Sequence, residues 1–225
     1  MLEDIKHEVR IVTLRRQPMN TLDINAIERL SEFFENHPPE MPLVLDGSEG
    51  VFSAGVDSKQ FMGYDHAQRH HLARAITRMT AKILSIPAPV VASIPGHALG
   101  GGLVLALCCD YRITTNNEQA KFGLLEAKAG IAFPDGPAEI VQSELPPTLL
   151  RQLTLTSQTM SAADLLRHGV FDESDHPDRL TELAIVRART LAEQPGFRAV
   201  KAQMRGALAA RVNQLAQAGR ESAFC

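Results

Sequence analysis

The chain has 225 residues, of which 44% are hydrophobic, and a formal net charge of −3. This length can bury one good core and favours a single domain, while the scattered lysines and arginines give no basic stripe that would indicate a nucleic-acid partner. No apolar run reaches the roughly 18 residues of a membrane span, and the segment from Met1 to Arg10 is too charged for a signal peptide, so we expect a cytoplasmic protein without a membrane partner.

The first half of the chain alternates predicted strands and helices. Apolar residues in alternation predict a strand over 9–13, and a single apolar face predicts a helix over 24–34, which Asn20 or Thr21 could cap. A short apolar strand over 43–45 then leads through a turn to the segment VFSAGVD, residues 51–57. This order is typical of an α/β protein.

A longer helix and a strand follow. Apolar residues at helical spacing over 72–83 predict the helix, which ends before Pro87, and residues 90–94 predict the strand. The polar stretch before the helix contains His66, His70 and His71, which lack a third ligand at defined spacing, so we expect solvated histidines and no metal site.

The strand enters the stretch IPGHALGGGLVLALCCD, residues 94–110. Gly100, Gly101 and Gly102 allow close approach to the backbone, and the uncharged residues after them predict a buried helix. The free N–H groups at the start of such a helix favour an anion or a developing oxyanion. Glycines before an apolar helix also occur for tight packing alone, so this stretch by itself does not establish a site.

The second half of the chain is more helical. Short strands are predicted over 111–114 and 121–123, and the segment LLEAKAGIAFPDG follows over 124–136. Later helices are predicted at these ranges: 149–155, 162–166, 180–191 and 200–215.

The motif FSAGVD, followed by GHALGGG and CDYRI, resembles the crotonase family, the enoyl-CoA hydratases and isomerases. The resemblance runs from about Val9 to Met204. It implies a spiral of ββα units over 1–175 with an acyl-CoA site, and C-terminal helices over 176–225 that build a homotrimer or a dimer of trimers. The family's last helix would begin about where this sequence stops, at Cys225, so we expect this region to be cut short and the acyl end of the pocket to be open.

The resemblance also implies a set of site residues. It assigns the oxyanion donors to the backbone N–H groups of Val56 and Gly101, beside substrate-binding residues of the two glycine motifs, and it assigns Arg15 to the coenzyme A phosphates, although a solvated arginine at a strand end is an equal alternative. Coenzyme A is part of the substrate and no separate cofactor is expected. The other substrate-binding residues that the resemblance implies are Ser53, Ala54, Gly55, Asp57, Lys59, Gly100 and Val104.

Glu126 is the family's carboxylate by position, and its apolar neighbours predict a pKa raised toward neutrality. Without the family, a surface glutamate on a helix would be the simpler interpretation. Hydratases use a second glutamate, whose place is taken here by Val104, so we expect an isomerase that moves a double bond from Δ3 to Δ2 with one carboxylate. Asp135 is the second choice for that carboxylate. The alternatives are a hydratase, another enolate chemistry such as thioester hydrolysis, and a scaffold without turnover.

Overall fold

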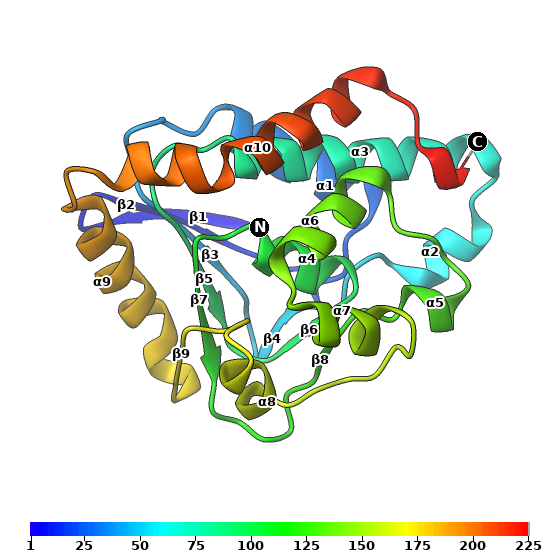
Figure 1. Ribbon diagram of the computed structural model, residues 1–225. Helices are drawn as coiled ribbons and strands as arrows, with labels where there is room; N and C mark the ends of the chain where they lie inside the picture. Colours follow the sequence, from blue (N-terminus) through cyan, green and yellow to red (C-terminus); the bar gives the residue numbers. More distant parts are fainter. Residues whose placement is uncertain (225) are drawn as a thin grey trace.

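The computed structural model, which describes residues 1–224, is built around a larger and a smaller β-sheet (Figure 1). The larger sheet has the order β1-β2-β3-β5-β7-β9, with β1 antiparallel to β2 and all other neighbours parallel. The smaller sheet, β4-β6-β8, is parallel throughout. In chain order, strands β1 to β9 are Leu2–Lys6, Val9–Thr13, Leu43–Asp46, Val51–Ser53, Val90–Ile94, His97–Leu99, Tyr111–Thr115, Phe122–Gly123 and Glu173–Asp175.

A three-part unit recurs along the chain: a strand of the larger sheet, a strand of the smaller sheet, and a helix. The first unit is β3 and β4 with α2 (Ser58–Gly63) and α3 (His66–Leu84), and the second is β5 and β6 with α4 (Gly101–Leu107). The third is β7 and β8 with α5 (Glu126–Ala129) and the helices after it. Since each unit adds one parallel strand to each sheet, the chain winds as a spiral, and the predicted spiral of ββα units is confirmed.

Helices cover both faces of the larger sheet. On one face, α9 (Leu180–Ala192) buries Leu180, Ala184 and Ile185 against β2, β3, β5 and β7. On the other side, α1 (Ile24–Glu35) packs on α3, and α10 (Phe197–Ala218) lies across α3 and α6 (Figure 1). The remaining helical segments are α6 (Asp135–Glu144), α7 (Pro147–Thr154), α8 (Ala162–Arg167), η1 (Pro177–Arg179) and η2 (Ser222–Phe224).

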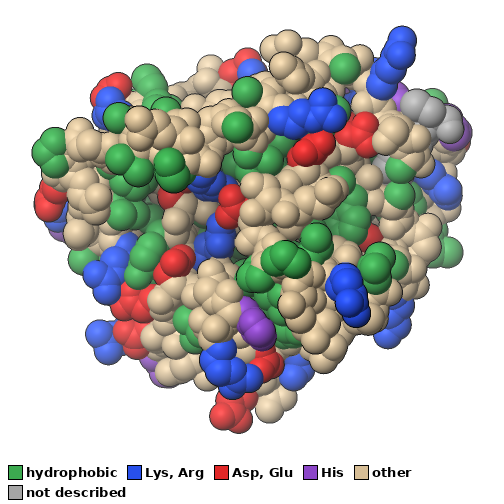
Figure 2. Space-filling view, in the orientation of Figure 1, with side chains coloured by type: hydrophobic (Ala, Val, Ile, Leu, Met, Phe, Trp, Pro, Cys, Tyr) green, Lys and Arg blue, Asp and Glu red, His purple; other side chains and the backbone are tan. Residues whose placement is uncertain are grey.

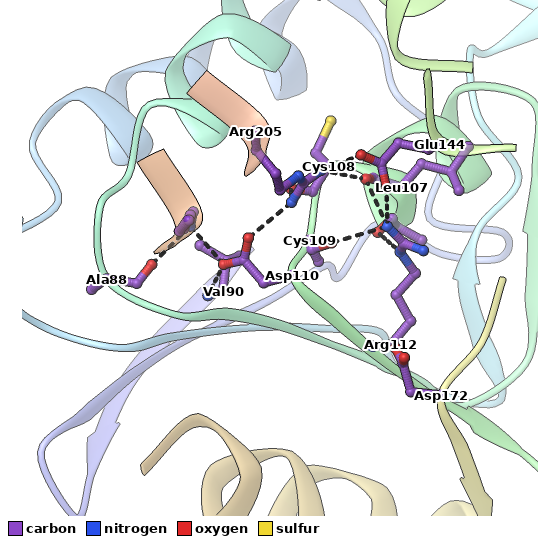
Figure 3. Close-up of polar contacts among 12 residues, drawn as sticks. Ala88, Val90, Leu107, Cys108, Cys109, Asp110, Arg112, Glu144, Asp172 and Arg205 are labelled. Carbon is purple, nitrogen blue, oxygen red and sulfur yellow. Dashed lines mark hydrogen bonds and ion pairs between the residues drawn. The ribbon is translucent and has the colours of Figure 1, made fainter. Parts of the chain in front are cut away.

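The central helix α4 is buried almost entirely, as the uncharged sequence predicts: Gly102 to Leu107 are all buried. Its last carbonyl groups therefore cannot reach water, and two arginines satisfy them (Figure 3). Arg112 donates to the carbonyls of Ala106 and Leu107, and Arg205 of α10 donates to those of Leu107 and Cys108. Both guanidinium groups also bind Glu144 of α6, so α4 is fixed between α6 and α10.

The structure corrects several local predictions. Asp23 caps α1, in place of Asn20 or Thr21, because its side chain accepts a hydrogen bond from Ala26 N. The polar histidine stretch forms the first turns of α3, where Asp65 and Gln68 make a capping box. β1 was not predicted, because all five of its residues are exposed.

The C-terminal helices pack back on the rest of the chain, so a boundary near residue 175 stays a prediction. Cys225, where the sequence places the start of the family's last helix, lies outside the described residues. Among residues 1–224, no helix combines the length and the apolar character needed to cross a membrane.

Candidate active site

Two positions of the glycine stretch, Gly100 and Gly102, require residues without a side chain. Gly100 has φ +51°, a left-handed conformation that side chains rarely adopt. A Cβ on Gly102 would lie 2.2 Å from the Ser53 carbonyl oxygen, which is impossible without movement. The loop therefore brings the start of α4 into direct contact with the segment after β4.

Two backbone N–H groups are available where these segments meet. The N–H of Leu22 donates to Gly55 O, and the carbonyl of Leu22 accepts from Asp57 N. The N–H of Val56, which lies between these two bonds, makes no backbone hydrogen bond in the described part of the chain. Gly101 is the first residue of α4 and has no intrahelical acceptor. Within residues 1–224 neither N–H has a hydrogen-bond acceptor, and a Cβ on Gly101 would lie 3.9 Å from Val56 N. The two predicted oxyanion donors are therefore neighbours.

The Glu126 carboxyl group lies beside this pair. Its Oε1 is 3.1 Å from the position that a Cβ on Gly100 would take, and its Oε2 is buried without a hydrogen-bond partner among the described residues. Burial raises the pKa of Glu126 to about 7, against the lowering effect of a hydrogen bond from its own backbone. Near neutral pH this group can therefore both accept and return a proton.

These groups open into a cavity of about 270 Å³ with a largely apolar wall. Six predicted residues line it together: Ala54, Val56, Gly100, Gly101, Val104 and Glu126. Sequence reasoning missed other residues of the wall. Among them, Phe61 belongs to α2, Phe133 lies in the segment before α6, and α3 contributes Arg69, Leu72 and Ile76. The helical spacing of Arg69 to Leu72 and Ile76 was the signal that could have placed Arg69 there.

Other predicted residues shape the loop without lining the cavity. Ser53 is buried, donates to Asn20 O at 2.7 Å and accepts from Gly55 N at 3.1 Å. Asp57 caps α2, and the hydrogen bond from Gln60 N, together with Arg16, lowers its pKa. Lys59 is exposed on α2 and is not among the residues that line the cavity.

Arg15 lies in a neighbouring cavity of about 250 Å³, between the end of β2 and α1. Arg16 in the same cavity is held by Asp23 at 3.0 Å and by Asp57 at 3.1 Å. Arg15 and Arg29, by contrast, are exposed and have no ion pair within residues 1–224. Of the two arginines at this strand end, Arg15 is thus the one that is free to meet an external phosphate.

Asp135 points to the C-terminal segment. Its carboxylate accepts hydrogen bonds from the backbone and hydroxyl of Ser222, at 3.1 and 2.5 Å, and its N–H donates to Glu221 at 2.7 Å. It begins α6 and is not among the residues that line the cavity, although Pro134 is. Its role as second-choice proton carrier has no support from this geometry.

No group of three or more histidine, cysteine or acidic side chains that could hold a metal ion occurs within residues 1–224. Cys108 and Cys109 are buried thiols, and burial raises the pKa of both, that of Cys109 to about 12. These thiols are therefore protonated and unreactive.

Comparison with known proteins agrees with this architecture. The family model described as enoyl-CoA hydratase/isomerase matches residues 4–223. A carnitinyl-CoA dehydratase of Salmonella heidelberg is 32% identical over 187 residues, which cover 81% of this chain and 69% of that protein. The chain belongs to the enoyl-CoA hydratase/isomerase family.

Solved structures give the same fold. An enoyl-CoA hydratase from Bacillus anthracis superposes with a TM-score of 0.82 at 26% identity, covering 97% of this chain and 89% of that one. An enoyl-CoA hydratase from Mycobacterium ulcerans superposes with a TM-score of 0.86 at 21% identity, covering 97% and 96%. At 21% identity, the similarity to the Mycobacterium ulcerans structure supports the fold alone.

Proposed function

We propose that the protein moves the double bond of an enoyl-CoA thioester from the Δ3 to the Δ2 position, with Glu126 as the single proton carrier. The observation that carries this proposal is a lone carboxyl group with a pKa near 7, placed beside two free backbone donors. The family membership supports a coenzyme A thioester as the substrate.

In the proposed reaction, ionised Glu126 removes a proton from C2 of the 3-enoyl thioester. The electron pair moves onto the thioester oxygen, where the N–H groups of Val56 and Gly101 stabilise the negative charge. Donors of this kind lower such barriers by about 3–4 kcal/mol each. Protonated Glu126 then delivers the proton to C4, the double bond forms between C2 and C3, and the carboxylate is restored.

Hydration or dehydration is the second candidate, because relatives that are 32% identical to this chain are named carnitinyl-CoA dehydratases. Two features of the cavity argue against it. Val104, at the place where the resemblance expects a second glutamate, is 2% exposed and cannot hold or activate water. The second feature concerns the carnitinyl group in particular. This group carries a quaternary ammonium, which the positive charge of Arg69 on the cavity wall would repel.

The experiment that tests the proposal compares two reactions of the wild-type protein. One assay follows conversion of a 3-enoyl-CoA to the 2-enoyl-CoA, and the other follows loss of 2-enoyl absorbance through hydration. We expect double-bond migration to be faster by at least about 10²-fold, the smallest effect that a missing acid–base group commonly has. Equal rates would favour the hydratase, and release of free coenzyme A would favour a hydrolase.

A further inference from the structure

A positively charged side chain lies in the wall of the largely apolar cavity that also holds Glu126. Arg69 is the fourth residue of α3 and shares its helix face with Leu72, Ala73 and Ile76, all of which line the cavity. Its guanidinium carbon lies 5.0 Å from the centre of the Phe61 ring, which also belongs to the wall. The arginine is thus held against the cavity by an aromatic contact.

Within residues 1–224, Arg69 has no anionic partner. Its Nε is buried without a hydrogen-bond partner, and its side chain makes no ion pair with any residue of the described chain. The buried guanidinium groups of Arg112 and Arg205, by contrast, both bind Glu144. The Arg69 side chain is partly exposed, but a buried N–H donor without an acceptor is costly. An anion bound in the cavity would supply the acceptor that the described part of the chain lacks.

Glu126 is the other charged group of the same cavity, but it is not that anion. The pKa of Glu126 is raised by burial, and no nearby cation contributes to its value. A guanidinium close to this carboxylate would lower the pKa instead. Arg69 and Glu126 are therefore separate charged groups of the cavity, whose wall is otherwise largely apolar.

We propose that Arg69 recognises a carboxylate at the far end of the substrate's acyl chain, so that the preferred substrates are thioesters of short dicarboxylic acids. This inference rests on the proposed function for the position of the thioester beside Val56 and Gly101. The planar guanidinium fork binds a carboxylate through two parallel hydrogen bonds. The cavity of about 270 Å³ is smaller than the about 300–1,000 Å³ of common ligand pockets, which favours a short chain.

The test is calorimetric binding of two saturated thioesters with the same five-carbon chain, glutaryl-CoA and pentanoyl-CoA. Both lack a double bond, so the protein cannot isomerise them and binding is measured alone. We expect the wild-type protein to bind glutaryl-CoA about 10- to 100-fold more tightly, the range for a hydrogen bond to a charged group.

Three variants assign the preference to the guanidinium. Arg69→Met should abolish it, and Arg69→Lys should retain part of it, because lysine keeps the charge but loses the fork. Arg78→Met is the matched control, since Arg78 is an exposed residue of the same helix outside the cavity wall. This variant should keep the full preference.

Equal binding of the two thioesters by the wild-type protein would overturn the inference, as would a preference that persists in Arg69→Met. Either result would leave the proposed function standing as long as pentanoyl-CoA binds. Failure of both thioesters to bind would instead overturn the proposed function itself.

Discussion

Glu126 has a buried and unpaired carboxyl oxygen and a pKa raised to about 7, and its ionised form is the one that removes the proton. We therefore expect kcat/KM for double-bond migration to rise with pH and to level off above a midpoint near 7. Initial rates with a 3-enoyl-CoA from about pH 5 to about pH 9 measure this profile. A flat profile over this range would show that another group carries the proton.

The same pKa shift makes a prediction about stability. The folded-state pKa lies above the unfolded value of 4.5, so the folded protein binds the proton more tightly, and stability is lost as pH rises from about 4.5 through about 7. Glu126→Gln removes this loss. We expect the variant to be more stable than wild type at about pH 8, by on the order of 1–3 kcal/mol, and equally stable at about pH 4. Thermal unfolding at the two pH values checks this, and a variant that is less stable at the higher pH would contradict it.

For individual residues, the sequence predicted the members of the candidate site that belong to recognisable local motifs. Glu126, Val56 and Gly101 meet in one cavity as the resemblance implied. Arg69 was missed, because the polar residues around it hide its place on the apolar face of α3. Asp57 was expected at the substrate, but it caps α2, a role that depends on the local backbone geometry.

The helix α4 joins the candidate oxyanion site at its first turn to the charged residues at its last turn. Arg205 binds the Leu107 and Cys108 carbonyls together with Asp110 and Glu144 (Figure 3). Its loss would leave the Cys108 carbonyl without this donor and would remove one of two cations from both Asp110 and Glu144, which keep Lys201 and Arg112. We therefore expect Arg205→Met to lower the free energy of unfolding by about 1–3 kcal/mol. Denaturant unfolding measures the change.

Arg211→Met is the control for this prediction. Arg211 lies on the same helix α10, where it pairs with Glu139 and its side chain is 54% exposed. Removal of this surface pair should cost less than about 1 kcal/mol. Equal effects of the two variants would mean that the contacts of Arg205 with α4 contribute little.

The order of elements was predictable because buried parallel strands and amphipathic helices have distinct apolar patterns. Helix α6 was not predicted, because Pro134, Asp135 and Gly136 are typical of a turn, and the close packing of Gly136 on Thr77 is a tertiary contact that the local sequence does not reveal. A Cβ on Gly136 would lie 2.9 Å from a Thr77 carbon, so this close contact requires glycine.

The whole molecule presents exposed apolar side chains on its C-terminal helices. Val186 of α9 is 53% exposed, and Val200 and Met204 of α10 are 54% and 73% exposed. Figure 2 shows hydrophobic side chains gathered over the region where α9 and α10 meet. We expect this surface to be buried between subunits of a homotrimer or a dimer of trimers.

Light scattering on the wild-type protein tests the assembly, and Met204→Glu should shift the mass toward the monomer by placing a charge in the interface. Met62→Glu is the matched control, because Met62 is 79% exposed on α2, far along the molecule from α9 (Figure 1). A strictly monomeric wild type at micromolar concentration would refute the expectation.

The central claim is that Glu126 carries the proton, and the most direct measurement is the rate of double-bond migration by Glu126→Gln, with pentanoyl-CoA binding followed in parallel. The amide keeps the shape of the side chain but cannot accept the proton. We expect the rate to fall by about 10²- to 10⁴-fold while binding is retained. Asp135→Asn, which alters the contact with Ser222, should keep most of the activity. Near-full turnover by Glu126→Gln, or loss of turnover by Asp135→Asn alone with folding and binding intact, would contradict the account.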